Sequence, residues 1–169
     1  MNKFAQIKHI QSIGKVHYYS IVIDNNEKSL FEDFNDYHRT DKWLEDLLIM
    51  NNWLIKRIPK EGALEKYFRH EGIRSDTKGL PPKFVETKNL LRLYCFRANT
   101  NVVFLFNGRC KTKSIPKAQD CPVVRPHFLL ANEIVIALNN LFSEDLIEWN
   151  EDYTDIIFDE ELTFEIEEL

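Results

Sequence analysis

The chain has 169 residues, 44% of them hydrophobic and 12% aromatic, a composition that supports one main core and excludes global disorder. No apolar run approaches the roughly 20 residues of a membrane helix, no apolar signal region follows the first residues, and the three cysteines form no CxxC pair. We therefore expect a cytoplasmic protein with reduced thiols, and we expect no membrane association, metal or cofactor.

The first half of the chain predicts one strand followed by two or three helices. Residues 16–23 are rich in β-branched and aromatic side chains, which predicts a strand, and Asp24 to Asn26 are suited to cap a helix that follows. Apolar residues at helical spacing predict this helix between Leu30 and Tyr37. A second helix is expected to begin at Asp41 and a short third one to cover residues 63–70, before a loop at 72–82.

The second half predicts a three-stranded meander and a long helix. The strands are expected at residues 83–86, 90–97 and 102–107, and the helix at 126–142. Alternating apolar residues at 162–166 predict a further strand, with 156–158 as its partner. The expected fold is therefore α+β with an antiparallel sheet. We expect an N-terminal extension at 1–15, a domain at 16–142 and an acidic tail at 143–169.

The distribution of charge is more informative than its sum of -5. All 22 Lys and Arg residues precede residue 126, against 15 acidic residues before residue 143, so residues 1–142 carry a net charge of +7. The remaining 27 residues hold 12 acidic side chains and no Lys or Arg. A basic body is suited to a polyanion such as RNA, although a solvated surface with unevenly placed charges explains the same numbers.

The hairpin at residues 90–107 is a candidate site. A loop of two or four residues pairs Arg97 with Val102, which predicts one wholly apolar face and one face that is basic at one end. Cations beside an aromatic ring are suited to neutralise phosphates and stack bases. The predicted RNA-binding residues are Lys83, Tyr94, Arg97, Arg109, Lys117 and Arg125.

Residues 90–117, LLRLYCFRANTNVVFLFNGRCKTKSIPK, resemble the hairpin of RelE/HigB-type toxins of bacterial toxin–antitoxin systems. The resemblance consists of Arg92 in the first strand, the apolar strand at 102–106, Asn107-Gly108 after it, and the Lys/Thr-rich segment 111–113. The order of elements over residues 16–142 fits as well. The acidic tail has no counterpart in the short toxins of this type.

The resemblance implies a metal-independent endoribonuclease that cleaves mRNA, usually on the ribosome, and that a cognate antitoxin restrains. It implies that Arg92 contacts the scissile phosphate, with Lys111 and Lys113 as the basic residues after the second strand. No general acid or base is identified. Two alternatives stay open: a binding module for a protein or nucleic acid that has lost the chemistry, and a gyrase-inhibiting relative.

The acidic tail allows two interpretations. It can fold back on the domain as an extra strand and place Glu165, Glu167 and Glu168 near Lys111, Lys113 and Lys117, as a built-in inhibitor of RNA binding. Alternatively, it is a solubilising appendage that packs elsewhere.

Overall fold

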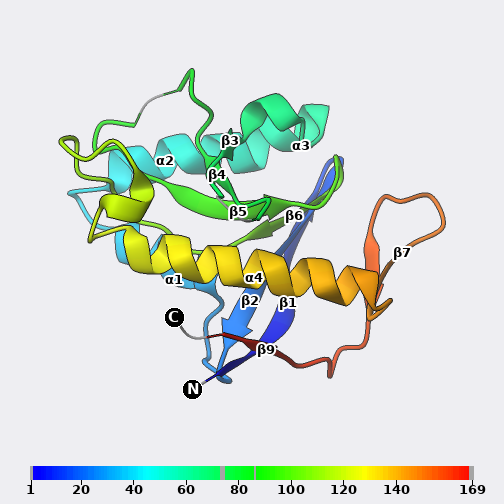
Figure 1. The fold of residues 1–169 in the computed structure, drawn as a ribbon. Coiled ribbons are helices and arrows are strands. Elements are labelled where there is room, and N and C mark those ends of the chain that lie inside the picture. The colour runs from blue at the N-terminus through cyan, green and yellow to red at the C-terminus, as the bar shows by residue number, and fades with distance from the viewer. Residues whose placement is uncertain (1, 73–74, 86, 168–169) are drawn as a thin grey trace.

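The computed structural model describes residues 2–72, 75–85 and 87–167, which form an α+β fold. A seven-stranded sheet of order β3-β4-β5-β6-β2-β1-β9 lies between the long helix α4 and the helical segment that contains α2 and α3 (Figure 1). A separate ribbon of two strands, β7 and β8, follows α4. The strands are β1 (Lys3–Ile13), β2 (Val16–Ile23), β3 (Arg69–His70), β4 (Lys78–Leu80), β5 (Leu93–Arg97), β6 (Val102–Leu105), β7 (Ile147–Trp149), β8 (Ile156–Phe158) and β9 (Phe164–Ile166). The helices are α1 (Leu30–His38), α2 (Leu44–Asn52), α3 (Ile58–Glu61) and α4 (Arg125–Ser143), with a π-helical segment (Trp53–Arg57) between α2 and α3 and short 3-10 turns at Glu65–Tyr67 and Ala118–Asp120.

Both faces of the sheet are buried. On one face Tyr94, Phe96 and Phe104 pack with the apolar side of α4, and on the other Leu93 and Leu105 pack with the helices between residues 30 and 61. The apolar character of both sets of alternating side chains in β5 and β6 follows from this central position. The predicted solvent-exposed basic face of the hairpin is therefore wrong.

Helix α1 begins with a side-chain cap, whereas α2 and α4 have none among the described residues. A capping box starts α1, in which Ser29 accepts from the amide of Glu32 and Glu32 accepts from the amide of Ser29, so the cap is Ser29 and not residues 24–26. The second helix starts at Leu44, three residues later than expected. The predicted helix at 63–70 is a 3-10 turn followed by β3, whereas α4 is confirmed with its proline in the first turn.

Residues 3–13, which we expected to precede the domain, form β1 and pair antiparallel with β2. The register shifts between His9 and Gln11, and this irregularity reverses the side-chain alternation. Ala5 and Ile7 therefore pack in the α4 core, whereas Ile13, which unbroken alternation would place on the same face, packs in the opposite core. The sequence thus lacks the regular period-2 pattern by which a strand is recognised.

The sheet is mixed, not purely antiparallel. His17 to Tyr19 of β2 run parallel to Val102 to Phe104 of β6. The meander consists of β4, β5 and β6, so its first strand lies at Lys78–Leu80 and not at 83–86. Residues 83–85 lie in a turn region, and residue 86 lies outside the described residues. The short β4 sequence, Lys-Gly-Leu, has no β-branched residue that would have predicted it.

The β5–β6 hairpin is shifted by one residue from the predicted register. Arg97 pairs with Val103, and not with Val102. The longer loop is stabilised by the Asn99 side chain, whose Oδ1 accepts from the amides of Asn101 and Val102 at 2.8 and 2.9 Å. Phe96 pairs with Phe104, so strand alternation places Arg92 toward the same face as Phe104. The predicted site required Arg92 and Phe104 to lie on opposite faces of the sheet, and they do not.

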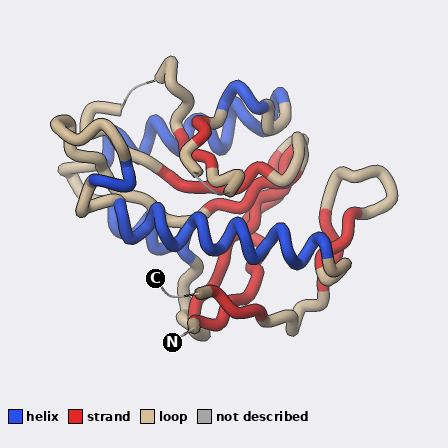
Figure 2. The backbone as a smooth tube through the Cα atoms, in the orientation of Figure 1, coloured by secondary structure: helices blue, strands red, loops and turns tan. Residues whose placement is uncertain are grey.

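The acidic C-terminal segment is built into the fold. Strand β9 pairs antiparallel with β1, and Ile147, Ile156, Phe164 and Ile166 are buried in the core beneath α4. The β7–β8 ribbon lies beyond the C-terminal end of α4 (Figure 2). Alternation at 162–166 thus correctly predicted a strand, but its partner is β1, while β8 pairs with β7.

The tail carboxylates do not lie where the built-in inhibitor hypothesis placed them. Glu165 accepts from Nδ2 of Asn2 at 3.0 Å. Burial, together with the charge of Glu167, raises the pKa of the Glu133 carboxyl group on α4. Glu168 lies outside the described residues. Because β9 adds to the edge of β1, its acidic side chains follow that edge and not the segment after β6.

Candidate nucleic-acid interface

An open cleft of about 480 Å³ lies between the segment that follows β6 and the α1–α2 connection. We call it the basic cleft, because five of its lining side chains are Lys or Arg and none of the described lining residues is acidic. The lining residues are Tyr37, Lys42, Trp43, Lys88, Asn89, Arg109, Cys110, Lys111, Lys113 and Val123.

The backbone after β6 places two of these cations together. Residues 90–92 and 109–111 continue the antiparallel pairing: the Arg92 amide donates to Arg109 O and the Lys111 amide donates to Leu90 O, both at 3.0 Å. Because side chains alternate between the two sides of an extended segment, Arg109 and Lys111, which flank Cys110, point toward the same side. Gly108 is required here because a Cβ atom at this position would lie 1.8 Å from the carbonyl oxygen of Arg92.

A relay of hydrogen bonds fixes the Arg109 guanidinium. Its NH1 group donates to Asn107 Oδ1 and to Gly108 O, each at 2.8 Å. The buried Asn107 side chain in turn donates from Nδ2 to Asp33 of α1 at 2.8 Å. This relay orients the guanidinium without pairing it directly to a carboxylate in the described structure.

Two aromatic rings also line the cleft, and a buried carboxylate fixes the turn that carries Lys88. The rings of Tyr37 and Trp43 stack with centroids 5.2 Å apart and an interplanar angle of 26°. Asp46 of α2 accepts from the backbone amides of Lys88 and Asn89 at 2.7 and 2.9 Å. These bonds satisfy the buried carboxylate and fix the turn that carries Lys88 to the rim of the cleft.

A buried ion pair lies close to the cleft. Glu71 Oε1 is 3.8 Å from Arg92 Nε, and their side chains are only 17% and 10% exposed. Burial raises the pKa of Glu71, although Arg92, Arg69, Lys111 and Lys83 act in the opposite direction. Lys111 thus lines the basic cleft and also acts on this carboxylate.

Sequence reasoning missed Glu71. Its side chain lies over Gly79 of β4, where an added Cβ atom would come within 2.9 Å of the carboxylate. Gly79 pairs with Tyr94 of β5, which brings Glu71 close to Arg92, the residue just before that strand. No motif marks this arrangement, and the only signal was a single acidic residue in the basic segment 69–74.

Three of the predicted residues are not available in the way we expected. Arg92 is only 8% exposed, and Tyr94 is completely buried against Phe128 of α4, so neither lies on a solvent-exposed sheet face. The Tyr94 hydroxyl has no hydrogen-bond partner within the described structure. Arg97 lies at the other end of β5, where it donates to Ala63 O and pairs with Glu65 at 3.6 Å.

The other predicted cations divide into two groups. Arg109, Lys111 and Lys113 converge at the basic cleft, as their grouping in the sequence suggested. Lys111 also donates from Nζ to Pro116 O at 2.9 Å. The remaining three, Lys83, Lys117 and Arg125, are exposed and do not line it.

The ion pair gives a test of stability. Arg92→Ala leaves Glu71 without its nearest cation in a largely buried site, and we expect the free energy of unfolding to fall by about 2–3 kcal/mol, somewhat less than for a completely buried pair. Lys113→Ala, at an exposed position, should change it by less than about 0.5 kcal/mol. Urea denaturation measures both values, and equal stabilities of the two variants would contradict a structural contribution from the pair.

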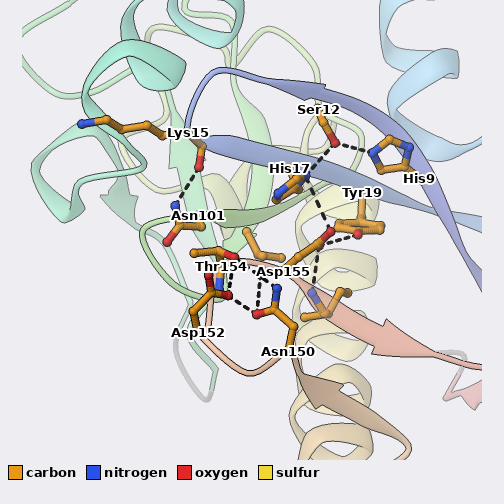
Figure 3. Close-up of polar contacts among 12 residues, drawn as sticks. His9, Ser12, Lys15, His17, Tyr19, Asn101, Asn150, Asp152, Thr154 and Asp155 are labelled. Carbon is orange, nitrogen blue, oxygen red and sulfur yellow. Dashed lines mark hydrogen bonds and ion pairs between the residues drawn. The ribbon is translucent and has the colours of Figure 1, made fainter.

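A second polar cluster connects the β1–β2 hairpin to the β7–β8 loop (Figure 3). Ser12 Oγ lies 2.6 Å from His17 Nδ1, and Asp155 Oδ2 lies 3.7 Å from the same nitrogen. A Ser-His-Asp catalytic relay requires the serine and the carboxylate to contact different nitrogens of the histidine. This cluster therefore has no such geometry. Asp155 instead accepts from the Tyr19 hydroxyl at 2.6 Å, and this hydrogen bond connects the β7–β8 ribbon to the sheet.

Comparison with known proteins identifies no relative: no family model matches the chain, nor does any curated protein or solved structure. The resemblance to RelE/HigB-type toxins therefore stays a prediction.

Within the described ranges, no three His, Cys, Asp or Glu side chains are grouped closely enough to hold a metal ion. None of the helices described is both long enough and apolar enough to cross a membrane.

Proposed function

We propose that this protein binds RNA in the basic cleft. The observation that carries the proposal is the convergence of five Lys and Arg side chains, with no acidic partner among the described lining residues. Such a site attracts phosphate groups, and the release of their counterions favours binding at low salt. The net charge of +7 over residues 1–142 acts in the same direction.

We further propose that the bound RNA is cleaved without a metal ion, as in a RelE/HigB-like mRNA endoribonuclease. The support is the position of Glu71 and Arg92 beside Lys111 of the cleft. Glu71 would accept the proton of an RNA 2′-hydroxyl, whose oxygen attacks the adjacent phosphorus to form a 2′,3′-cyclic phosphate, while the 5′-oxygen leaves and takes a proton from water. Arg92 and Lys111 would stabilise the additional negative charge on the phosphate in the transition state.

By the same resemblance, the substrate would be mRNA on the ribosome in the cytoplasm, and a cognate antitoxin would restrain the activity. A second candidate function is RNA binding without cleavage. The observation in its favour is the low exposure of both members of the Glu71–Arg92 pair, which limits access of a phosphate to Arg92. Cleavage assays on ribosomes that carry mRNA would separate the two functions.

The number of phosphate contacts in the cleft can be measured from salt dependence. For single-stranded nucleic acid, each contact contributes about 0.7 to the slope of log affinity against log salt. The double variant Lys88→Gln/Lys113→Gln should therefore bind a short labelled single-stranded RNA more weakly, with a slope that is lower by about 1.4. Fluorescence anisotropy over a range of salt concentrations gives both quantities.

A matched control removes two lysines at the opposite end of the sheet. Lys15 and Lys60 are exposed, and the Lys15 amide donates to Pro59 O beside the β1–β2 turn. The variant Lys15→Gln/Lys60→Gln has the same total charge as the cleft variant. An equal decrease in slope for the two variants would contradict the assignment of RNA to the basic cleft.

A further inference from the structure

The basic cleft contains a preformed stack of planar groups. The Arg109 guanidinium carbon lies 3.6 Å from the ring centroid of Tyr37, which itself stacks on Trp43. The Nζ atom of Lys42 lies 4.7 Å from the ring centroid of Trp43. We call Tyr37, Trp43 and Arg109 the aromatic platform.

The platform is rigid, yet part of it is open to solvent. Arg109 is fixed by its bonds to Asn107 and Gly108, and Trp43 is held by its contacts with Tyr37 and with the buried His38. Tyr37 is nevertheless 42% exposed, and it lines the cleft together with Trp43 and Arg109. A soluble protein gains little stability from a large aromatic ring kept at the surface, whereas a binding site gains a planar apolar surface.

The size and the composition of the cleft fit one nucleotide. Its volume of about 480 Å³ is within the range of small-molecule sites, about 300–1,000 Å³. Arg109 and Trp43 already lie against the Tyr37 ring, so a nucleobase would extend this stack beyond Arg109 or beyond Trp43; bases stack both on Arg guanidinium planes and on aromatic rings. Lys88, Lys111 and Lys113 line the same cleft and are placed to contact the flanking phosphates.

From this arrangement we propose that the substrate is single-stranded RNA and that one of its bases stacks on the aromatic platform. The inference rests on the proposed RNA binding and adds to it a requirement for an unpaired base. A duplex cannot satisfy this requirement without losing a base pair, because its bases are already stacked on one another. Tyr37, Trp43 and Arg109 are thus the residues that select single strands, while the lysines supply affinity without regard to sequence.

The experiment compares three probes with the same number of phosphate groups: a single-stranded RNA, the same backbone without bases, and a duplex formed from two RNA strands of half the length. The full chain should bind the single strand about tenfold more tightly than the abasic strand, since a stacked base contributes that order of affinity. Arg109→Lys keeps the charge but removes the planar group, and Tyr37→Leu removes the ring. Each variant should lose most of the preference for bases while its affinity for the abasic strand changes little.

Matched controls lie outside the cleft. Arg57→Lys alters an Arg that lies over the Trp53 ring at 5.3 Å, and Tyr153→Leu alters a Tyr that is 64% exposed. Both controls should keep the tenfold preference, and thermal melting confirms that every variant is folded. Equal affinity of the unaltered protein for RNA and for the abasic strand would overturn the stacking inference but leave RNA binding intact. Failure to bind any of the three probes would instead overturn the proposed function, and the inference with it.

Discussion

Glu71→Gln is expected to slow RNA cleavage by about a hundredfold or more, because the amide keeps the size of the side chain but cannot accept a proton. Removal of a general base typically costs between 10² and 10⁴ in rate. The affinity for RNA should not fall, since the variant removes a negative charge close to the basic cleft. Single-turnover cleavage with saturating protein separates the rate of the chemical step from binding.

The raised pKa of Glu71 gives this prediction a pH dependence. The base must be ionised, so the cleavage rate should rise with pH through a value above the ordinary range of Glu. This acidic limb should be absent from the residual activity of Glu71→Gln. Stability should change in the opposite direction: the folded state holds this proton more tightly than the unfolded chain, so the free energy of unfolding decreases as pH rises through the same window.

A matched control is available in the second Glu–Arg pair. Glu65 lies 3.6 Å from Arg97 at the far end of β5 and is largely exposed. Glu65→Gln should leave both the cleavage rate and its pH profile unchanged. If Glu71→Gln cleaves RNA as fast as the unaltered protein, Glu71 is not the base, and RNA binding without a catalytic function for Glu71 remains.

The second large effect concerns the C-terminal segment. Ile166 of β9 is buried in the core beneath α4, so Ile166→Ala should lower the free energy of unfolding by about 2–4 kcal/mol through lost burial and a residual cavity. Ile157 of β8 is 58% exposed, and Ile157→Ala should lower it by less than about 0.5 kcal/mol. Urea denaturation of the two variants provides the comparison.

This result would replace the hypothesis that the tail covers the RNA site. Because β9 lies at the β1 edge, removal of residues 159–169 should unfold a large fraction of the protein and not activate it. Typical domains have a total stability of about 5–15 kcal/mol, and this deletion removes both Phe164 and Ile166 from the core. A truncated chain that stays fully folded and binds RNA more tightly would support the original hypothesis.

The sequence predicted those elements whose pattern is local and regular. Helix α4 has a broad apolar face and a proline in its first turn, and both its type and its position were correct. Strand β1 was missed because its irregular register at His9 and Gln11 divides its apolar residues between two cores. The β5–β6 register was wrong because both faces are apolar, so burial could not distinguish one pairing from the next.

The site was predictable only where its residues are neighbours in sequence. Arg109, Lys111 and Lys113 alternate along one extended segment, and their convergence followed from that spacing. Tyr37 and Trp43 carry patterns that indicate helix burial, and only the packing of α1 and α2 brings them into the same cleft as those cations. Glu71 reaches Arg92 across β4, a strand that the sequence did not predict.

The sheet also constrains the order in which the chain can fold. Two of its pairings join distant segments, His17 with Val102 and Ala5 with Phe164. Pairings of such high contact order form slowly, because a long loop must close before any contact stabilises it. During synthesis β1 can pair with β2 early, but its other edge has no partner until residue 166 has left the ribosome. The nascent chain therefore exposes an unpaired strand edge throughout the synthesis of the segment between β2 and β9, and chaperones or self-association would act at this edge.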